Sequence, residues 1–387
     1  MQKEYIDLPL KDKQLMATGK FYLAVFSIQP KPGKTILDVA SEVAAESSTG
    51  TNMRVGTVTK FSDSLDALVY HVSEKKGLVW IAYPWRIFDR GGNIQNIMTY
   101  VAGNIFGMSE VTGLRLLDVW FPDSFLKKYD GPSYTLDNLR NYLKVYHRPI
   151  LGTIVKPKIG LKPKEYAKVC YDFWSGGGDF VKNDEPQADQ EFCPFADTVK
   201  AVRKAMDKAE KETDHKKIHS FNISAADFDT MIKRAELVKK NMKPGSFAFL
   251  VDGITAGWTA VQTIRRHYPG VFLHFHRAGH GALTRPEDHL GYTVLVLSKH
   301  ARLAGASGLH TGTAGVGKMK GEVGEDIVSA QMILRQKASG HFFEQDWGKM
   351  KKVCPIISGG LNPLKLAPFI KAFGGVDFIT TMGGGVH

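Results

Sequence analysis

A lysine and two carboxylates stand close together in residues 176–186, which read GGGDFVKNDEP. The apolar pair at 180–181 predicts a short buried strand, and the glycines before it predict a tight turn. Because side chains alternate along a strand, Lys182 and Asp184 should point to the same side, with Glu185 following where the strand ends. Two adjacent carboxylates suit Mg²⁺, which binds few protein ligands and keeps several waters.

The lysine in this group has two interpretations. As an ammonium, Lys182 would compete with a metal ion for the same carboxylates. As a neutral amine that carries a carboxyl group, it would become a carbamate and supply an anionic third ligand. A buried ion pair between Lys182 and Asp184 that closes a turn also explains the segment when it is taken alone.

Composition narrows the class of protein. The chain has 387 residues, of which 43% are hydrophobic, enough for one large domain and a smaller one. No apolar run approaches the ~20 residues that cross a bilayer, and the charged N-terminus is unlike a signal peptide. Cys170, Cys193 and Cys354 are far apart and predict neither a zinc site nor a disulfide framework. We therefore expect a cytoplasmic protein with no membrane partner.

The formal net charge of +12 raises the possibility of a nucleic-acid partner. Much of this charge, however, lies on helical faces such as residues 203–217, where lysine and glutamate alternate. No basic run is interleaved with aromatic residues. A substrate with more than one phosphate explains the cations equally well, so we expect no nucleic-acid partner.

The elements that must position these residues fall into two predicted domains. Residues 1–135 mix strand-like and helical stretches and predict a compact α+β domain, which ends near the turn DGPS at 130–133. Residues 136–387 alternate short apolar strands with amphipathic helices, which predicts a (β/α)₈ barrel. A doubly wound sheet is the alternative, but no Gly-x-Gly-x-x-Gly follows the first strand. The eight expected strands are 151–155, 180–182, 219–223, 247–252, 272–276, 308–311, 356–358 and 378–381.

A barrel of this kind carries its active site at the carboxyl ends of its strands. Polar residues and glycines that follow the predicted strands should therefore converge there, and the glycine clusters could bring backbone N–H groups close to a phosphate. These residues are Lys156, Lys158, Lys182, Asp184, Glu185, His276, Arg277, His310, Ser358, Gly359, Gly360, Gly383, Gly384 and Gly385.

Two further segments have open interpretations. His274 and His276 lie on one strand face; they could bind a metal, but hydrogen bonding to a substrate is the better interpretation for His276, and His274 could be an ordinary core histidine. Residues 313–322 are rich in small residues around Lys318, which suits either a lid that excludes water or a flexible loop. The chain ends at His387, so we expect a barrel without its last helix, apparently through truncation.

Eight motifs occur in a fixed order along the chain and together resemble one family, the large subunit of ribulose-1,5-bisphosphate carboxylase/oxygenase (RuBisCO). The amino-acid sequences of these motifs are most similar to those of the archaeal-type form II/III members. The motifs are AESSTGT at 45–51, GN at 103–104, TIVKPK at 153–158, GGGDFVKNDEP at 176–186, HRAGH at 276–280, HTGT at 310–313, GKM at 317–319 and ISGG at 357–360.

This resemblance implies a ferredoxin-like N-terminal domain and a carboxy-lyase that fixes CO₂ on ribulose 1,5-bisphosphate, with O₂ as the substrate of a monooxygenase reaction. It implies that Lys182 is carbamylated by an activating CO₂, binds Mg²⁺ with Asp184 and Glu185, and removes the C3 proton. Lys156 would act as acid and base on the enediol, and Lys318 would stabilise the new carboxylate.

The resemblance also implies the substrate-binding residues and the assembly. Lys158 would lie at the metal edge of the substrate, while His276, His310 and Arg277 would hold hydroxyl and phosphate groups. The other phosphate would lie against Ser358, Gly359, Gly360, Gly383 and Gly384. Glu46, Thr51 and Asn104 would complete the site of a partner subunit in a homodimer with shared sites, with higher homo-oligomers left open.

Two departures from the family pattern leave other functions open. Lys320 stands where many members have a glutamate, and the family normally continues beyond the position of His387. The alternatives are a RuBisCO-like enolase or isomerase acting on a related sugar phosphate, and an inactive truncated chain. The presence of Lys156, Lys318 and His310 favours the carboxylase, since RuBisCO-like relatives typically lose several such residues.

Overall fold

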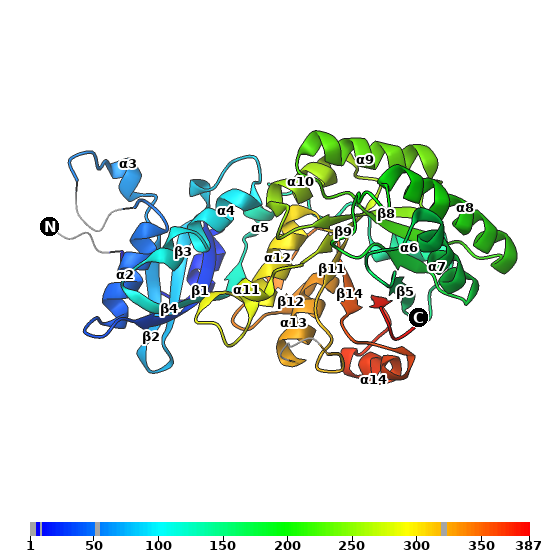
Figure 1. The fold of residues 1–387 in the computed structure, drawn as a ribbon. Helices are drawn as coiled ribbons and strands as arrows, with labels where there is room; N and C mark the ends of the chain where they lie inside the picture. Colours follow the sequence, from blue (N-terminus) through cyan, green and yellow to red (C-terminus); the bar gives the residue numbers. More distant parts are fainter. Residues whose placement is uncertain (1–4, 8–9, 51–54, 319–322) are drawn as a thin grey trace. The chain divides into compact units, whose positions relative to one another are not determined.

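The computed structural model describes residues 5–7, 10–50, 55–318 and 323–387. They form two compact units, each of which is described by itself (Figure 1). The predicted domain boundary at residue 135 stays a prediction, because compactness alone does not define an independently folding domain. The first unit contains residues 1–130, 280–303 and 335–350, and the second contains 131–279, 304–334 and 351–387.

The first unit is built on a five-stranded sheet with the order β10-β4-β1-β3-β2. Its strands are β1 (Phe21–Pro30), β2 (Leu68–Ser73), β3 (Leu78–Pro84), β4 (Val111–Trp120) and β10 (Leu290–Tyr292), and β12 (Lys337–Ser339) pairs with β13 (Glu344–Asp346) in a separate hairpin. Its helices are α1 (Asp12–Thr18), α2 (Ile36–Glu46), α3 (Lys60–Asp63), α4 (Ile94–Val101), α5 (Asp123–Leu126), α11 (Gly281–Thr284) and all but the last residue of α12 (Val294–Ala304), with 3₁₀ turns η1 (Glu74–Lys76), η2 (Trp85–Ile87) and η3 (Asn104–Gly107). The sheet and its helices confirm the predicted α+β domain.

A buried ion pair joins the three sequence segments of the first unit. Lys299 on α12 and Asp118 on β4 are both fully buried, with 2.6 Å between Nζ and Oδ1. The other carboxylate oxygen of Asp118 accepts the backbone N–H groups of Phe342 and Phe343. Removing one partner of such a pair leaves an uncompensated buried charge, which typically costs about 3–5 kcal/mol.

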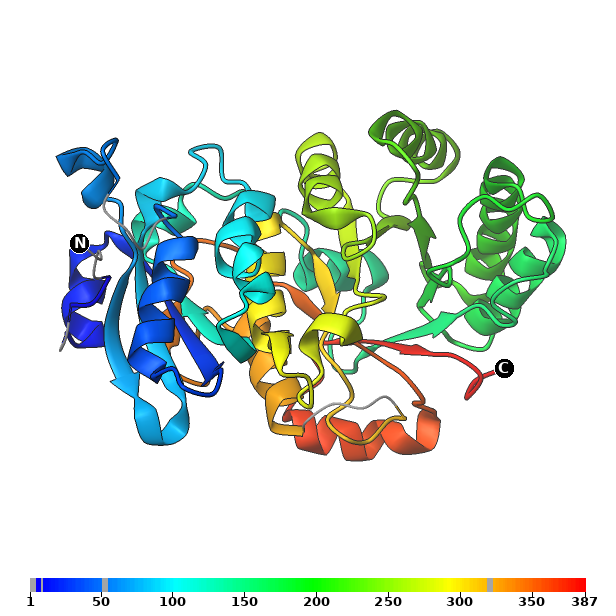
Figure 2. The ribbon, with the colours of Figure 1, turned by 60° about the vertical axis from the view of Figure 1, so that its left-hand side comes forward.

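The second unit is a closed barrel of eight parallel strands, which confirms the predicted fold. The barrel runs β5 (Ile150–Ile154), β6 (Phe180–Lys182), β7 (Ile218–Asn222), β8 (Phe247–Asp252), β9 (Phe272–His276), β11 (Gly308–His310), β14 (Cys354–Ser358) and β15 (Ile379–Met382). Its helices are α6 (Leu136–Leu143), α7 (Pro163–Ser175), α8 (Phe195–Thr213), α9 (Phe228–Asn241), α10 (Gly257–His267), α13 (Val323–Leu334) and α14 (Pro363–Phe373). Helices α7 to α10 lie outside the strands in both views (Figure 1, Figure 2).

Local sequence signals explain several helix starts in the barrel. Asp227 caps α9 by accepting the N–H of Thr230 at 2.7 Å, and Asn362 caps α14 by accepting the N–H of Lys365 at 3.1 Å. A proline also stands at the start of α7 and of α14, where its fixed φ suits the first turn. Beyond β15 no helix follows in the described residues 383–387.

Helix α6 closes the amino end of the barrel. Its Leu136, Leu139 and Leu143 pack in one cluster with the first residues of the strands, among them Ile150 and Phe180. The carboxyl ends of the strands are therefore the end at which a site can form. Among the helices of the described residues, none combines the length and the apolar character needed to cross a membrane.

Candidate active site

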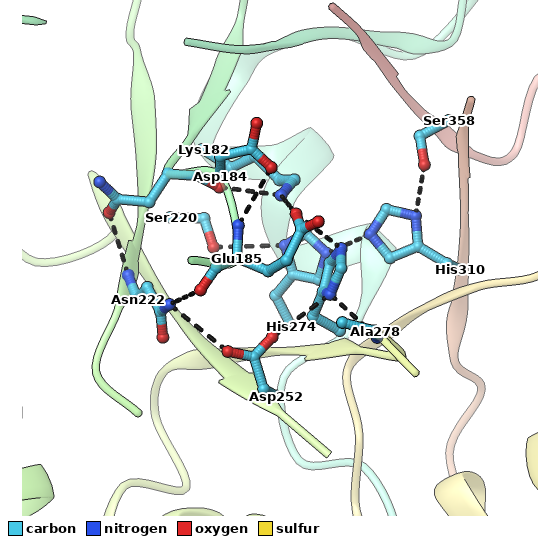
Figure 3. Close-up of polar contacts among 12 residues, drawn as sticks. Lys182, Asp184, Glu185, Ser220, Asn222, Asp252, His274, Ala278, His310 and Ser358 are labelled. Atoms are coloured by element: carbon cyan, nitrogen blue, oxygen red, sulfur yellow. Dashed lines mark hydrogen bonds and ion pairs between the residues drawn. The ribbon is translucent and has the colours of Figure 1, made fainter. Parts of the chain in front are cut away.

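Lys182 ends β6 and its side chain is fully buried. Its Nζ donates to the backbone carbonyl of Asn183 at 2.8 Å and lies 3.8 Å from Oε2 of Glu185 (Figure 3). Burial lowers the pKa of Lys182; the cation of Lys156 lowers it further, whereas Glu185 and Asp184 oppose this shift. The environment therefore favours the neutral amine more than water does.

Asp184 and Glu185 follow directly and lie beside this amine (Figure 3). Burial alone would raise the pKa of Asp184, but its hydrogen bond with Glu185 and its ion pair with Lys156 hold that pKa below its ordinary value. Burial raises the pKa of Glu185, and the neighbouring Asp184 raises it further. A cation that bound here would therefore face two carboxylates from adjacent residues.

His276 lies between two carboxylates at the end of β9. Its Nδ1 is 3.3 Å from Oδ1 of Asp252, and its Nε2 is 3.5 Å from Oε2 of Glu185. Burial and the cation of Lys182 together lower the pKa of His276 to about 4, although Asp252 opposes this shift. The ring is therefore neutral near neutral pH and can both donate and accept a hydrogen bond.

A chain of hydrogen bonds links residues of four strands, from the middle of β7 and β9 to the ends of β11 and β14 (Figure 3). The Oγ of Ser220 is 3.3 Å from Nδ1 of His274, the Nε2 atoms of His274 and His310 are 2.9 Å apart, and Nδ1 of His310 is 2.8 Å from Oγ of Ser358. Burial holds the pKa values of both histidines well below their ordinary range. Both nitrogens of His274 are used within this chain, as expected of a core histidine, whereas His310 lies nearer the edge.

Sequence reasoning missed two residues of this site, Asn222 and Asp252. The side-chain amide of Asn222 donates to the carbonyl of Glu185 at 2.7 Å and lies 3.5 Å from Oδ2 of Asp252 (Figure 3). Asn222 ends β7 and Asp252 ends β8, whereas the predicted strands ended at residues 223 and 252, so the rule that located Lys182 and His276 also points to Asp252 and to the residue beside Asn222.

The remaining predicted residues of the barrel lie in the loops that follow its strands. Arg277 follows β9, and burial lowers the pKa of its guanidinium to about 10, so it stays charged. Its Nη1 is buried and has no hydrogen-bond partner among the described residues, which suits a residue that receives an anion. Lys158 is exposed after β5, while Gly359 and Gly360 follow β14, and Gly383 and Gly384 follow β15.

Three predicted residues belong to the first unit. Asn104 donates from Nδ2 to Oε1 of Glu46 at 3.3 Å, and both side chains are exposed. Thr51 lies outside the described residues, as does Lys320 of the loop after β11. The structure therefore brings Glu46 and Asn104 together within their own unit.

Lys318 belongs to the loop that follows β11 and is exposed. Its backbone N–H donates to the carbonyl of Gly359 at 2.8 Å, so the loop contacts the glycine cluster after β14. A Cβ at Gly360 would lie 2.5 Å from Cγ and 2.8 Å from the backbone nitrogen of Lys318, and Gly360 has a φ of +80°. Gly360 thus allows Lys318 its position.

We expect Gly360→Ala to displace Lys318 and, if Lys318 acts on the substrate as the sequence predicts, to lower the rate of the catalysed reaction at least about tenfold, since small misplacements of a catalytic group are costly. Gly374→Ala is the matched control, because Gly374 has a φ of +77° and nothing within 4 Å of its added Cβ. Both variants should lose about 1–2 kcal/mol of stability from the left-handed backbone. Steady-state rates and thermal unfolding check this; equal activities of the two variants would contradict it.

Asp184 and Glu185 suit a metal ion only if a carboxylated Lys182 adds a third anionic ligand. Among the described residues, no three His, Cys, Asp or Glu side chains are arranged to hold a metal ion. Asp184 and Glu185 supply two carboxylates, and a carboxylated Lys182 between them would supply the third anionic group.

Two family matches cover nearly the whole chain. Residues 135–387 match the catalytic domain of the ribulose bisphosphate carboxylase large chain, and residues 9–125 match its N-terminal domain. The chain belongs to the RuBisCO large-chain family. It is therefore an enzyme of the carboxy-lyase class, as the sequence motifs predicted.

Several RuBisCO proteins show the extent of this likeness. Ribulose bisphosphate carboxylases of Rhodopseudomonas palustris strain TIE-1 and of Paramagnetospirillum magnetotacticum are each 46% identical, over 98% and 99% of this chain and 85% of their own lengths. Among solved structures, the dimeric archaeal RuBisCO of Hyperthermus butylicus has a TM-score of 0.90 at 36% identity, covering 99% of this chain and 88% of its own. The octameric RuBisCO of Pyrococcus horikoshii has a TM-score of 0.89 at 32% identity, covering 100% and 88%.

Proposed function

We propose that this chain carboxylates ribulose 1,5-bisphosphate to 3-phosphoglycerate in a Mg²⁺-dependent reaction, with oxygenation by O₂ as the competing reaction. One observation carries the proposal: a fully buried lysine with a lowered pKa lies beside two carboxylates at the carboxyl end of the barrel. Few functions explain a buried lysine in that place, because a buried ammonium is costly unless it is paired. A carbamate makes the same residue a ligand and a base.

In this proposal an activating CO₂ reacts with the neutral amine of Lys182. The carbamate would hold Mg²⁺ together with Asp184 and Glu185. When bound, the ion would act as a Lewis acid on the oxygens of the substrate. Lys156 contributes as a nearby cation, because it lowers the pKa of Lys182 and so favours the neutral amine, which can attack CO₂ and release a proton as the carbamate forms.

The proposed roles of the other residues are those that the resemblance to the RuBisCO family implies. The carbamate oxygen of Lys182 takes the C3 proton of the substrate, and Lys156 serves as acid and base on the enediol and protonates the final carbanion. Lys318 places a cation against the carboxylate that forms when CO₂ adds. His276 is neutral and therefore holds a hydroxyl group by hydrogen bonding rather than by charge. His310 is also neutral, but both of its ring nitrogens contact His274 and Ser358, so it would take up a substrate hydroxyl by exchanging one of these hydrogen bonds.

We propose that the two phosphates of the substrate bind at separate places. The buried Nη1 of Arg277 has no other described partner and would receive one of them. The other would lie against Ser358 and the glycines at 359–360 and 383–384, with Lys158 near the metal edge. Backbone N–H groups of such glycine clusters approach anions closely because no Cβ intervenes.

We further propose a homodimer in which Glu46, Thr51 and Asn104 of one subunit complete the site of the other. The dimeric and octameric RuBisCO structures that resemble this chain support a homo-oligomer. The three cysteines are buried and unpaired, which suits the reducing cytoplasm that we propose as its location.

The lowered pKa of Lys182 predicts how activation depends on pH. At a fixed concentration of dissolved CO₂, the activated fraction should rise with pH, because only the neutral amine reacts, and its midpoint should lie below the ordinary lysine value of 10.5. Stability of the unactivated chain should rise over the same window, because the unfolded state then binds more protons than the folded state. Initial rates after preincubation at different pH measure this. A midpoint at or above 10.5 would contradict the assignment.

Product stoichiometry tests the proposed reaction. Carbon balance requires that one five-carbon bisphosphate and one CO₂ give two molecules of 3-phosphoglycerate. Phosphorus NMR of a reaction with ribulose 1,5-bisphosphate, bicarbonate and Mg²⁺ should therefore show two equivalents of one monophosphate. A product that keeps both phosphates on one carbon chain would indicate an isomerase instead.

A further inference from the structure

A cavity of about 370 Å³ opens at the amino end of the barrel, away from the carboxyl ends that carry the candidate active site. Three of its lining residues lie just before barrel strands: Arg148 before β5, Asp179 before β6 and Lys217 before β7. The loop between α6 and β5 supplies another wall. The catalytic assignments use none of these residues, so the cavity is a separate feature of the same unit.

The lining of this cavity is strongly basic. Lys144, Arg148 and Lys217 face a single carboxylate, that of Asp179, which leaves a formal surplus of two positive charges. Two histidines, His147 and His215, also line it and add positive charge when they are protonated. A concave site with this surplus attracts anions and holds them more strongly than a flat surface does.

Lys217 is the most informative member of the lining. Only 1% of its surface is exposed, and its Nζ donates to the carbonyl of Gly178 at 2.9 Å. An ammonium has three N–H donors, so two remain for other acceptors. None of the ion pairs within 4 Å among the described residues includes its ammonium, and burial lowers its pKa, although Asp179 and Glu210 oppose this shift from a greater distance. An anion in the cavity would supply the missing acceptors and charge.

Arg148 and Asp179, which line the cavity together with Lys217, form an ion pair with each other. The two terminal nitrogens of Arg148, Nη1 and Nη2, pair with the carboxylate of Asp179, Nη2 at 2.9 Å. Asp179 also accepts the N–H of Leu151 at 2.8 Å. Asp179 is thereby neutralised and fixed. The free positive charge of the cavity therefore comes from Lys144 and Lys217.

The side chain of Arg140 holds the loop that carries Lys144 in place. Arg140, 5% exposed on α6, donates to the carbonyls of Val145 at 2.8 Å and Arg148 at 3.1 Å, and to that of Val376 at 2.8 Å. Through Arg140, these bonds connect the loop between α6 and β5 to Val376, which lies just before β15. A wall that is fixed before binding costs little ordering when a ligand enters.

We propose that this cavity binds a small phosphorylated anion carrying at least two negative charges. Its volume lies in the range of small-molecule sites, about 300–1,000 Å³. The ammonium groups of Lys144 and Lys217 bind the phosphate oxygens, and the exposed ring of Tyr146 in the same lining packs against the organic part. The inference does not depend on the proposed carboxylase reaction, since it uses different residues at the opposite barrel end.

Calorimetry with inorganic pyrophosphate tests this site. The full chain would carry Arg277→Ala, which removes the cation proposed to bind phosphate at the active site. We expect this chain to bind one equivalent of pyrophosphate, and we expect Lys144→Glu added to it to weaken binding at least about tenfold, because like charges repel the ligand. Lys217→Met should weaken binding similarly, with thermal unfolding confirming that each variant is folded.

The matched control is Lys216→Glu, an exposed charge reversal one residue from Lys217 and outside the lining. It should change the affinity less than about twofold, because the ammonium of Lys216 pairs with Glu210 at 3.8 Å and does not line the cavity. Equal weakening by Lys144→Glu and Lys216→Glu would indicate diffuse attraction and overturn the proposal. Absence of binding at millimolar pyrophosphate, or binding that Lys144→Glu leaves unchanged, would also overturn it.

Discussion

Lys182→Met should lose carboxylation by at least about 10³-fold while the protein stays folded, because the residue that would act as ligand and base is removed. Methionine has a similar length and no charge, so it fits a position that is fully buried. The substitution removes the lysine partner of Glu185, but Glu185 is one-third exposed and Asp184 keeps its ion pair with Lys156, so neither carboxylate is left as an uncompensated buried charge. We therefore expect an unchanged or higher Tm, measured by thermal unfolding, together with a carboxylation rate near background.

Two variants complete this test. Lys168→Met removes an exposed lysine of α7 that pairs with Asp172, and it should keep full activity. Lys182→Arg keeps a positive charge but cannot form a carbamate, so it should be as inactive as Lys182→Met. Substantial activity in either Lys182 variant would show that the buried amine is not the group that carries the reaction.

Lys318→Ala should separate two steps of the proposed reaction. Its ammonium is assigned to the carboxylate that forms when CO₂ adds, so its loss should lower carboxylation by about 10²–10³-fold. Proton removal at C3 is assigned to Lys182 and should continue. Exchange of the C3 hydrogen with D₂O, followed by NMR, should stay within about tenfold of the unmodified protein, given that binding is otherwise intact.

Lys371→Ala provides the control for charge, because Lys371 is an exposed lysine on α14. It should leave both carboxylation and exchange unchanged. If Lys318→Ala lost exchange and carboxylation to the same extent, Lys318 would be needed for substrate binding rather than for the later step, and its assigned role would be wrong.

The barrel and much of its site could be predicted because local signals agree with the global fold. Most barrel strands are short apolar runs with a polar residue at or just after their end, as at Lys182 and His276. In a closed parallel barrel all such ends meet at one edge. The positions of His310 and Ser358 followed from this rule together with the family motifs. The two side chains are hydrogen-bonded to each other.

The rest depends on contacts between residues distant in sequence. Strand β10 pairs with β4 in the first unit, although 170 or more positions separate them, and its three residues carry no strand signal of their own. The buried pair of Lys299 and Asp118 is likewise invisible to periodicity, because a lysine within a helix normally indicates a solvent face. The hydrogen-bond partners of His274 also required the structure, since the order of the strands in a barrel does not show which side chains meet inside it.

The carbamate on Lys182 is the central claim, and labelled CO₂ tests it most directly. The chain would be preincubated with bicarbonate and Mg²⁺, then given ribulose 1,5-bisphosphate with labelled CO₂, and acid-stable label in 3-phosphoglycerate would be counted. We predict label that depends on preincubation in the unmodified chain and background label in Lys182→Met. Initial rates that are independent of preincubation, or label formed by Lys182→Met, would contradict the claim.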